Sequence, residues 1–217
     1  MIEYSCYNDI KGKEIAEDLL KIEAIKLQPN DPFTWASGWS SPIYCDNRLS
    51  LSYPAVRTKV KEAFAELINT KYKQVDAIAG VATAGIPQGA LVADALDIPF
   101  IYVRSKSKSH GLANQIEGRV KSDMKVVVLE DLVSTGGSSL AAVEALRDAK
   151  IEVLGMVSIF TYGFPIAEEN FRNAKVNLTF LSNYELLIES AIDQQLISNE
   201  LKEKLNQWRK DPANWSA

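Results

Sequence analysis

The sequence predicts an α/β fold with a central parallel sheet flanked by helices, and three observations predict it. Strand-like and helix-like stretches alternate from about residue 76 to residue 160. The strand-like stretches are apolar on both faces, as in sheets that helices cover on both sides. One of them, 126–129, runs directly into a glycine-rich turn and a helical pattern. With 217 residues, we expect one domain (1–217) with small N-terminal hood elements at about residues 10–51.

The order of elements follows from periodicity. Charged residues between regularly spaced apolar residues predict a first helix over 10–25. A second helix is expected from Tyr53-Pro54 to residue 68, because proline fits the first helical turn. Between them, residues 29–51 hold Pro, Gly, Ser and aromatic residues, which is typical of a flap. The remaining strands are expected at 76–80, 100–103, 126–129, 153–160 and 176–181, and the remaining helices at 86–95, 138–149, 185–197 and 199–208. Trp208 and Trp215 are expected to be packing residues.

Composition limits the classes of function. A net charge of −4 and a pI near 5.2 argue against binding nucleic acid through overall charge. Two cysteines and a single histidine cannot build a structural zinc site or a disulfide framework, so a reducing cytoplasm is the expected location. The first residues lack the pattern of a signal peptide, and no apolar run is long enough for a membrane span. We therefore expect neither nucleic acid nor a membrane as a partner.

The strand at 126–129 carries the strongest functional signal. Glu130 and Asp131 follow it, and the small-residue turn 134–138 then begins a helix. Such a turn gathers free backbone N–H groups and the positive end of the helix dipole, which suits a phosphate. The two acids would repel a phosphate unless the ligand also offers hydroxyl groups or a cation, as a ribose 5-phosphate with Mg²⁺ does. The alternative is an ordinary strand-to-helix turn with a capping serine.

The run V-V-V-L-E-D-L-V-S-T-G-G-S-S at 126–139 resembles the phosphoribosyl pyrophosphate (PRPP) motif of the type I phosphoribosyltransferases. The resemblance implies the fold of that family, with Mg²⁺ held mainly through PRPP and no dedicated metal ligands in the protein. It implies a catalytic part for Asp131. It also implies that PRPP is bound by Glu130, Asp131, Leu132, Val133, Ser134, Thr135, Gly136, Gly137 and Ser138.

A long segment without periodicity, 104–118, separates two of the strands, and connections of this length are typically lids or disordered. Arg104, Lys106, Lys108 and His110 alternate with serines, so they could face one polyanion; the alternative is a solvated basic loop. The segment resembles the mobile loop of the orotate phosphoribosyltransferases, with matches at Arg104, Lys108, His110 and Gly111 and a departure at Ser105, beside which Lys106 could supply the charge. The resemblance implies that Arg104, Lys108 and His110 bind PRPP, that Lys108 and His110 are catalytic, and that the three act across a homodimer.

Residues 81–87, V-A-T-A-G-I-P, follow another strand and are similar to the pyrophosphate-binding loop of the same superfamily. Small residues permit a backbone to approach an anion closely, although a tight strand-to-helix turn explains the pattern as well. Ala82, Arg104 and Glu130 each follow a strand end. We therefore expect these three positions to converge on the carboxyl edge of the sheet.

The N-terminal segment indicates the base. Lys26, the pair Phe33-Thr34 and the run S-G-W-S-S-P-I-Y ending at Tyr44 are similar to the corresponding run of the orotate enzymes. The resemblance implies that Lys26, Tyr44 and Ser134 bind orotate. Many members also carry an arginine soon after the strand at 153–160, which is missing here, and Arg48 is either its substitute or a surface residue.

The activity expected from this resemblance is transfer of phosphoribose from PRPP to orotate, giving orotidine 5-phosphate and pyrophosphate for pyrimidine biosynthesis. Two alternatives stay open. One is a phosphoribosyltransferase for another base, and the other is a noncatalytic PRPP-binding regulator built on the same fold.

Overall fold

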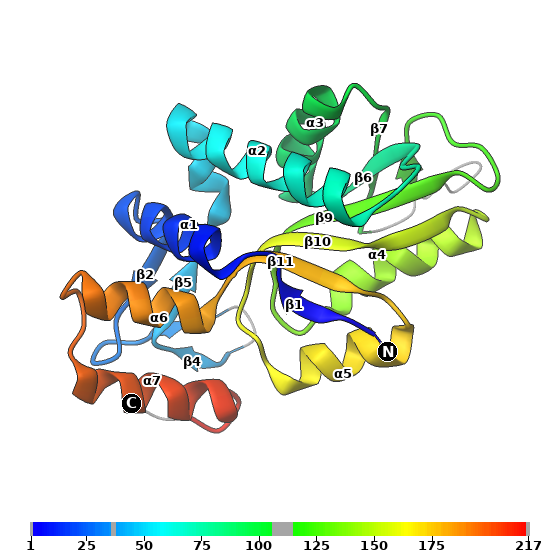
Figure 1. Ribbon diagram of the computed structural model, residues 1–217. Coiled ribbons are helices and arrows are strands. Elements are labelled where there is room, and N and C mark those ends of the chain that lie inside the picture. The colour runs from blue at the N-terminus through cyan, green and yellow to red at the C-terminus, as the bar shows by residue number, and fades with distance from the viewer. Residues whose placement is uncertain (1, 36–37, 106–114, 216–217) are drawn as a thin grey trace.

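The computed structural model describes residues 2–35, 38–105 and 115–215, and a seven-stranded sheet runs through its centre (Figure 1). All neighbouring strands are parallel except the last pair, which is antiparallel. The expected α/β class with a central parallel sheet is therefore confirmed. In spatial order the strands are β1 (Tyr4–Cys6), β11 (Leu178–Asn183), β10 (Glu152–Thr161), β9 (Lys125–Val133), β6 (Ala77–Val81), β7 (Phe100–Val103) and β8 (Ile116–Glu117).

Helices cover both faces of the sheet, which is why its central strands are apolar throughout. One face carries α1 (Asp9–Lys21), α2 (Pro54–Lys71) and α3 (Gly85–Leu96), and the opposite face carries α4 (Gly137–Asp148) and α5 (Pro165–Ala174) (Figure 1). Two C-terminal helices complete the chain at one end of the molecule: α6 (Tyr184–Asp193) packs against α1, and α7 (Asn199–Lys210) lies beyond it.

Strand β9 forms the middle of the core, and its residues 126–129 are completely buried. One detail of the prediction is wrong: the strand does not end before Glu130 and Asp131 but continues through them to Val133. The reason is pairing with β10, whose register runs on through Leu132↔Phe160 and Val133↔Thr161. Both acids are therefore held on a strand, which fixes their backbone more firmly than a loop would.

Three elements outside the hood were not anticipated from the sequence: β1, β8 and α5. The two strands are only three and two residues long and lie at the edges of the sheet, where little periodicity can develop. Helix α5 begins with Pro165 at its first position, which is a known start signal.

Two small antiparallel sheets, which we call the hood sheets, lie in the segment between α1 and α2. One pairs β2 (Ile25–Leu27) with β5 (Ile43–Cys45), and the other pairs β3 (Phe33–Thr34) with β4 (Ser40–Ser41). A 3₁₀ helix, η1 (Asn47–Ser52), then leads into α2. Helix α1, although inside the range expected for the hood, packs against α6 and β11 of the main body.

The strand order changes direction between β6 and β9. The chain leaves β6 towards β7 on one side, whereas β9, β10 and β11 build outward on the other. In open α/β sheets such a switch point leaves a crevice at the carboxyl ends of the strands, where ligands bind. Among the described ranges, no helix is long and apolar enough to cross a membrane.

Candidate active site

Residues 134–138, which we call the phosphate loop, comprise the turn between β9 and α4 and the first two residues of α4. Gly136 has φ +83°, and a Cβ on it would lie 2.7 Å from a ring carbon of Phe171, so the position needs glycine on both counts. At Gly137, by contrast, an added Cβ would meet only Thr135 Oγ1, at 4.0 Å, among the described residues outside the helix's own backbone. Asn170 on α5 holds the loop by donating a 3.0 Å hydrogen bond to the Thr135 carbonyl. The protein thus fixes one glycine and leaves open space at the other.

Glu130 and Asp131 stand immediately before this loop. Glu130 is only 6% exposed and accepts hydrogen bonds of 3.1 Å from the Ser139 hydroxyl and from the Asp131 backbone N–H. Burial, together with the neighbouring Asp131 carboxylate, raises the pKa of Glu130 well above its usual range. Burial also raises the pKa of Asp131, against the opposing effects of its hydrogen bonds and of Arg48. A bound cation or hydroxyl donors would lower the unfavourable free energy of keeping two neighbouring carboxylates ionised in a buried site.

Asn47 connects the first residue of η1 to the acid pair. Its side chain is buried, and its amide donates a 2.8 Å hydrogen bond to the Asp131 main-chain carbonyl. Its amide oxygen accepts a long contact, 3.4 Å, from the Cys45 thiol. The segment after the hood sheets is thereby tied to the strand that carries the acids.

A small cavity of about 120 Å³ brings together Ala82 and Arg104, two of the three positions expected to converge, while Glu130 is not in its lining. Its walls come from the ends of β6 and β7 and from the start of α4, including Ala82, Arg104 and Ser138. One guanidinium nitrogen of Arg104, Nη1, is buried, lies 3.6 Å from Glu117 Oε1, and has no hydrogen-bond partner among the described residues. The carboxyl ends of β6 and β7 therefore meet the phosphate loop, with a cation beside it.

A second cavity, of about 380 Å³, lies between the hood sheets and the sheet edge. We call it the aromatic pocket, and it is lined by Thr34, Trp35, Tyr44, Cys45, Leu132, Ser134 and Tyr162. Tyr44 and Ser134, two of the three residues expected to bind orotate, both belong to this lining. Ser134 is also the first residue of the phosphate loop, so the aromatic pocket opens directly beside that loop.

Two titratable groups of the aromatic pocket, Tyr162 and Cys45, are held in their neutral forms. Burial raises the pKa of the Tyr162 phenol well above its usual range. Desolvation, followed by the Asp131 and Asp46 carboxylates, does the same for the pKa of the Cys45 thiol. A flat heterocycle could stack on the aromatic walls while hydroxyl groups hold its polar edge.

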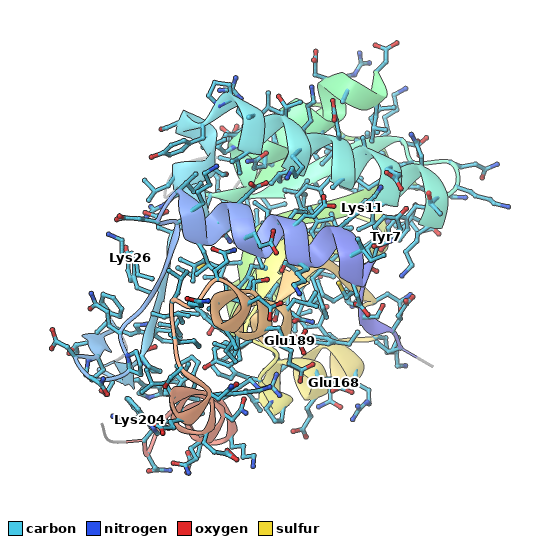
Figure 2. All side chains as sticks on the ribbon, turned by 60° about the vertical axis from the view of Figure 1, so that its left-hand side comes forward. Tyr7, Lys11, Lys26, Glu168, Glu189 and Lys204 are labelled. Carbon is cyan, nitrogen blue, oxygen red and sulfur yellow. The ribbon has the colours of Figure 1, made fainter. Side chains whose placement is uncertain are left out.

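Lys26 lies beside the aromatic pocket but is not part of its lining. It pairs in register with Tyr44 across β2 and β5, so the two side chains share one face of that sheet. Its ammonium contacts Glu23 at 2.9 Å, and Figure 2 shows Lys26 at the edge of the molecule on β2. Arg48, the other cation considered, is bound to Asp46 through Nε at 2.6 Å and Nη2 at 2.9 Å. Both ion pairs are exposed and weak enough to exchange for a ligand.

Lys106, Lys108, His110 and Gly111 lie outside the described residues, so their expected parts in PRPP binding and catalysis stay predictions. Within residues 2–35, 38–105 and 115–215, no group of three or more His, Cys, Asp or Glu side chains is placed to hold a metal ion. That Mg²⁺ would be held mainly through PRPP stays a prediction, with Glu130 and Asp131 as the two carboxylates at hand.

The fold and the phosphate loop define a phosphoribosyltransferase: the family model described as "Phosphoribosyl transferase domain" matches residues 51–182. Similarity over nearly the whole chain narrows the assignment. A Bacteroides thetaiotaomicron orotate phosphoribosyltransferase is 63% identical over 93% of this chain and 95% of its own, and one from Cytophaga hutchinsonii is 55% identical over 94% and 97%. The chain therefore belongs to the orotate phosphoribosyltransferase family.

Solved structures agree with this assignment. The crystal structure of orotate phosphoribosyltransferase from Aeropyrum pernix is 27% identical with a TM-score of 0.73, covering 85% of this chain and 99% of that one. UMP synthase from Leishmania donovani is also 27% identical with a TM-score of 0.77, covering 92% of this chain and 43% of its own.

The sequence reasoning missed three residues that the structure brings to the site: Asn47, Trp35 and Tyr162. Asn47 sits in a polar stretch and carried no signal. Trp35 directly follows the Phe33-Thr34 pair that helped to indicate the base, but nothing in the sequence marked it as a pocket residue. Tyr162 directly follows β10, and its place at the carboxyl end of a central strand is the signal that could have found it.

Proposed function

We propose that this chain transfers the 5-phosphoribosyl group from PRPP to orotate and thereby produces orotidine 5-phosphate and pyrophosphate, a step of pyrimidine biosynthesis. One observation carries the proposal: Ser134 belongs both to the phosphate loop and to the lining of the aromatic pocket. A sugar phosphate in the loop would therefore present its C1 towards a base stacked in the pocket. Holding two reactants in this way lowers the barrier by orientation alone.

The residues divide into roles by position. The phosphate loop would hold the 5-phosphate through backbone N–H groups and the start of α4. Glu130 and Asp131 would hold the ribose hydroxyls. Ala82 and Arg104 line the small cavity of about 120 Å³, to which Ser138 also belongs, and the pyrophosphate would lie there.

Displacement of pyrophosphate passes through a cationic, oxocarbenium-like sugar, while negative charge grows on the leaving group. Lys108 and His110 would stabilise that charge, and a closing loop would exclude water. Mg²⁺ bound with PRPP would supply further charge neutralisation, and the buried acid pair is a suitable neighbour for it.

Orotate is a planar acid, so the pocket must match both properties. Trp35, Tyr44 and Tyr162 offer faces for stacking, while Thr34 and Ser134 offer hydroxyl groups. For its carboxylate we propose Lys26 or Arg48, which flank Tyr44. Comparing the KM for orotate of Lys26→Ala and Arg48→Ala identifies the partner, since loss of the true partner raises that KM by about tenfold or more.

A pyrophosphate-release assay tests the proposed reaction directly. Purified protein is supplied with PRPP, Mg²⁺ and, in turn, orotate, uracil, adenine, hypoxanthine or xanthine. Orotate should be turned over in preference to every other base. Preference for a purine would reject the base assignment, and PRPP binding without turnover of any base would favour a regulator.

We also propose a homodimer in the cytoplasm whose sites are shared, with Lys108 and His110 serving the partner's site. Arg104, which was expected to act with them, lines the small cavity of its own chain, so we assign it to its own site. Mixing inactive Lys108→Ala and Asp131→Asn variants tests the sharing, because a hybrid dimer would contain one intact site. Activity should return on mixing. Persistent inactivity in a mixture shown to contain hybrids would refute the shared site.

A further inference from the structure

Trp208 on α7 stands at the centre of an aromatic cluster. The side chain is completely buried, although α7 buries only one other residue, Leu205. Its indole ring lies 5.4–5.8 Å, between ring centroids, from the rings of Trp35, Tyr162, Phe164 and Tyr184. These partners come from a hood-sheet segment, from the end of β10 and from α6. Trp208 is thus the point where three distant parts of the chain meet.

Two of these partners form the wall of the aromatic pocket. Trp35 and Tyr162 both line it and contact each other with ring centroids 5.2 Å apart. Trp208 packs edge-on against both, at 84° to each ring. Trp208 is not part of the pocket lining, so it contacts the two rings from outside the cavity.

Trp208 also holds the hood sheets by a hydrogen bond. Its indole N–H donates to the Ser40 carbonyl at 3.2 Å, and Ser40 pairs with Thr34, another residue of the pocket lining. The β3–β4 sheet is only two residues long on each side, so it has few interactions of its own to keep it in place. The contact with Trp208 supplies one.

Helix α7 is itself anchored to the main body. The Tyr184 hydroxyl donates a 3.0 Å hydrogen bond to the Leu205 carbonyl, and Arg209 pairs with Glu185 at 2.8 Å. Figure 2 labels Glu189 on α6 and Lys204 on α7 and shows α7 lying below α6. Trp208 is therefore carried on a helix whose place is set by α6.

We infer that Trp208 is a positioning residue for base recognition: it holds Trp35 and Tyr162 in the packed arrangement that forms one wall of the aromatic pocket. This inference rests on the proposed function, because it assumes that the base occupies the aromatic pocket. Trp208 touches none of the residues of the phosphate loop in the contacts described above. Its influence should therefore fall on orotate and not on PRPP.

The test separates positioning from mere stability. Trp208→Phe keeps an aromatic ring and removes the bond to Ser40, while Trp208→Leu removes the ring as well. We expect the KM for orotate to rise about three- to tenfold in Trp208→Phe and further in Trp208→Leu, while the KM for PRPP and kcat stay within about twofold. Phe64→Leu is the matched control, because Phe64 is a completely buried aromatic residue on α2. It should lower the melting temperature without changing either KM.

The KM values of the Trp208 variants decide whether Trp208 positions the pocket wall. An unchanged KM for orotate in Trp208→Phe, or equal increases for orotate and PRPP, would overturn the inference. If Trp208→Leu fails to fold, Trp208→Phe still decides. Failure of the proposed function is distinguishable, since it would show as a wild-type protein that does not turn over orotate at all.

Discussion

The side-chain amide of Asn47 donates a 2.8 Å hydrogen bond to the main-chain carbonyl of Asp131. This bond joins a residue of η1 to the strand that carries the acid pair, 84 positions away. It holds the backbone of Asp131 at the point where the ribose would lie, so its loss should be felt in both stability and activity.

Asn47→Ala should lower the free energy of unfolding by about 1–3 kcal/mol, because a buried carbonyl loses its donor. It should also lower kcat/KM for PRPP by about tenfold or more, since a small misplacement of a catalytic group is costly. Steady-state kinetics and denaturant unfolding measure the two effects. Asn177→Ala is the control: Asn177 also bonds to the main chain, at Glu3, but before the start of β11. An Asn47 variant that matched this control in kinetics would contradict the assigned role.

Substitution by alanine should destabilise the protein at Gly136 but not at Gly137. Gly136→Ala forces a side chain into a left-handed conformation and against Phe171, so it should cost at least ~1–2 kcal/mol and lower the melting temperature by several degrees. Gly137→Ala has room and should change the melting temperature by less than about 2 °C.

Gly137→Asp then tests the ligand, because it adds a negative charge in the same open space. It should raise the KM for PRPP by about tenfold or more without unfolding the protein. A wild-type KM for PRPP in this variant would contradict the proposal that the phosphate loop binds the 5-phosphate of PRPP.

Glu130→Gln should stabilise the ligand-free protein at neutral and alkaline pH. A carboxyl whose pKa is raised by folding stabilises the native state fully only below its unfolded pKa, near 4.3, and that contribution is lost as the pH rises through the folded value. The variant should therefore melt higher than wild type at pH 8, and the difference should shrink towards pH 4. Glu152→Gln controls for the loss of one charge at an exposed position. A difference independent of pH would contradict the shifted pKa.

Lys108→Ala should lower kcat by roughly two orders of magnitude, as expected when an electrostatic stabiliser of the transition state is removed. Lys121→Ala, at an exposed lysine before the start of β9, should leave kcat unchanged. Turnover of both variants at the wild-type rate would exclude Lys108 from the mechanism.

Much of the fold was predictable because its signals are local. The apolar composition of residues 126–129 is enough to predict a central strand, and the glycines of the turn 134–138 predict the start of a helix. The acid pair was found for the same reason. Its continuation within β9 was not, because that depends on pairing with β10, which no local pattern encodes.

The aromatic pocket could be predicted only in part. Tyr44 and Ser134 were expected from motif resemblance, whereas Trp35, Tyr162 and Trp208 come together only through tertiary packing. Their positions in the chain lie far apart, and nothing in the sequence around each aromatic residue connects it with the other two. Lys26 shows the converse, since the motif identified the residue but not its ion pair with Glu23.

The phosphate loop and the acid pair fall inside the stretch shared with phosphoribosyltransferases generally, 51–182, whereas Thr34, Trp35, Tyr44 and Cys45 precede it and Trp208 follows it. Most of the lining that would choose the acceptor thus lies outside the segment that would handle the sugar donor, although Leu132, Ser134 and Tyr162 of the same pocket lie inside it. A descendant or an engineered version could exchange its flanking segments and acquire a new acceptor while the inherited donor chemistry stayed intact.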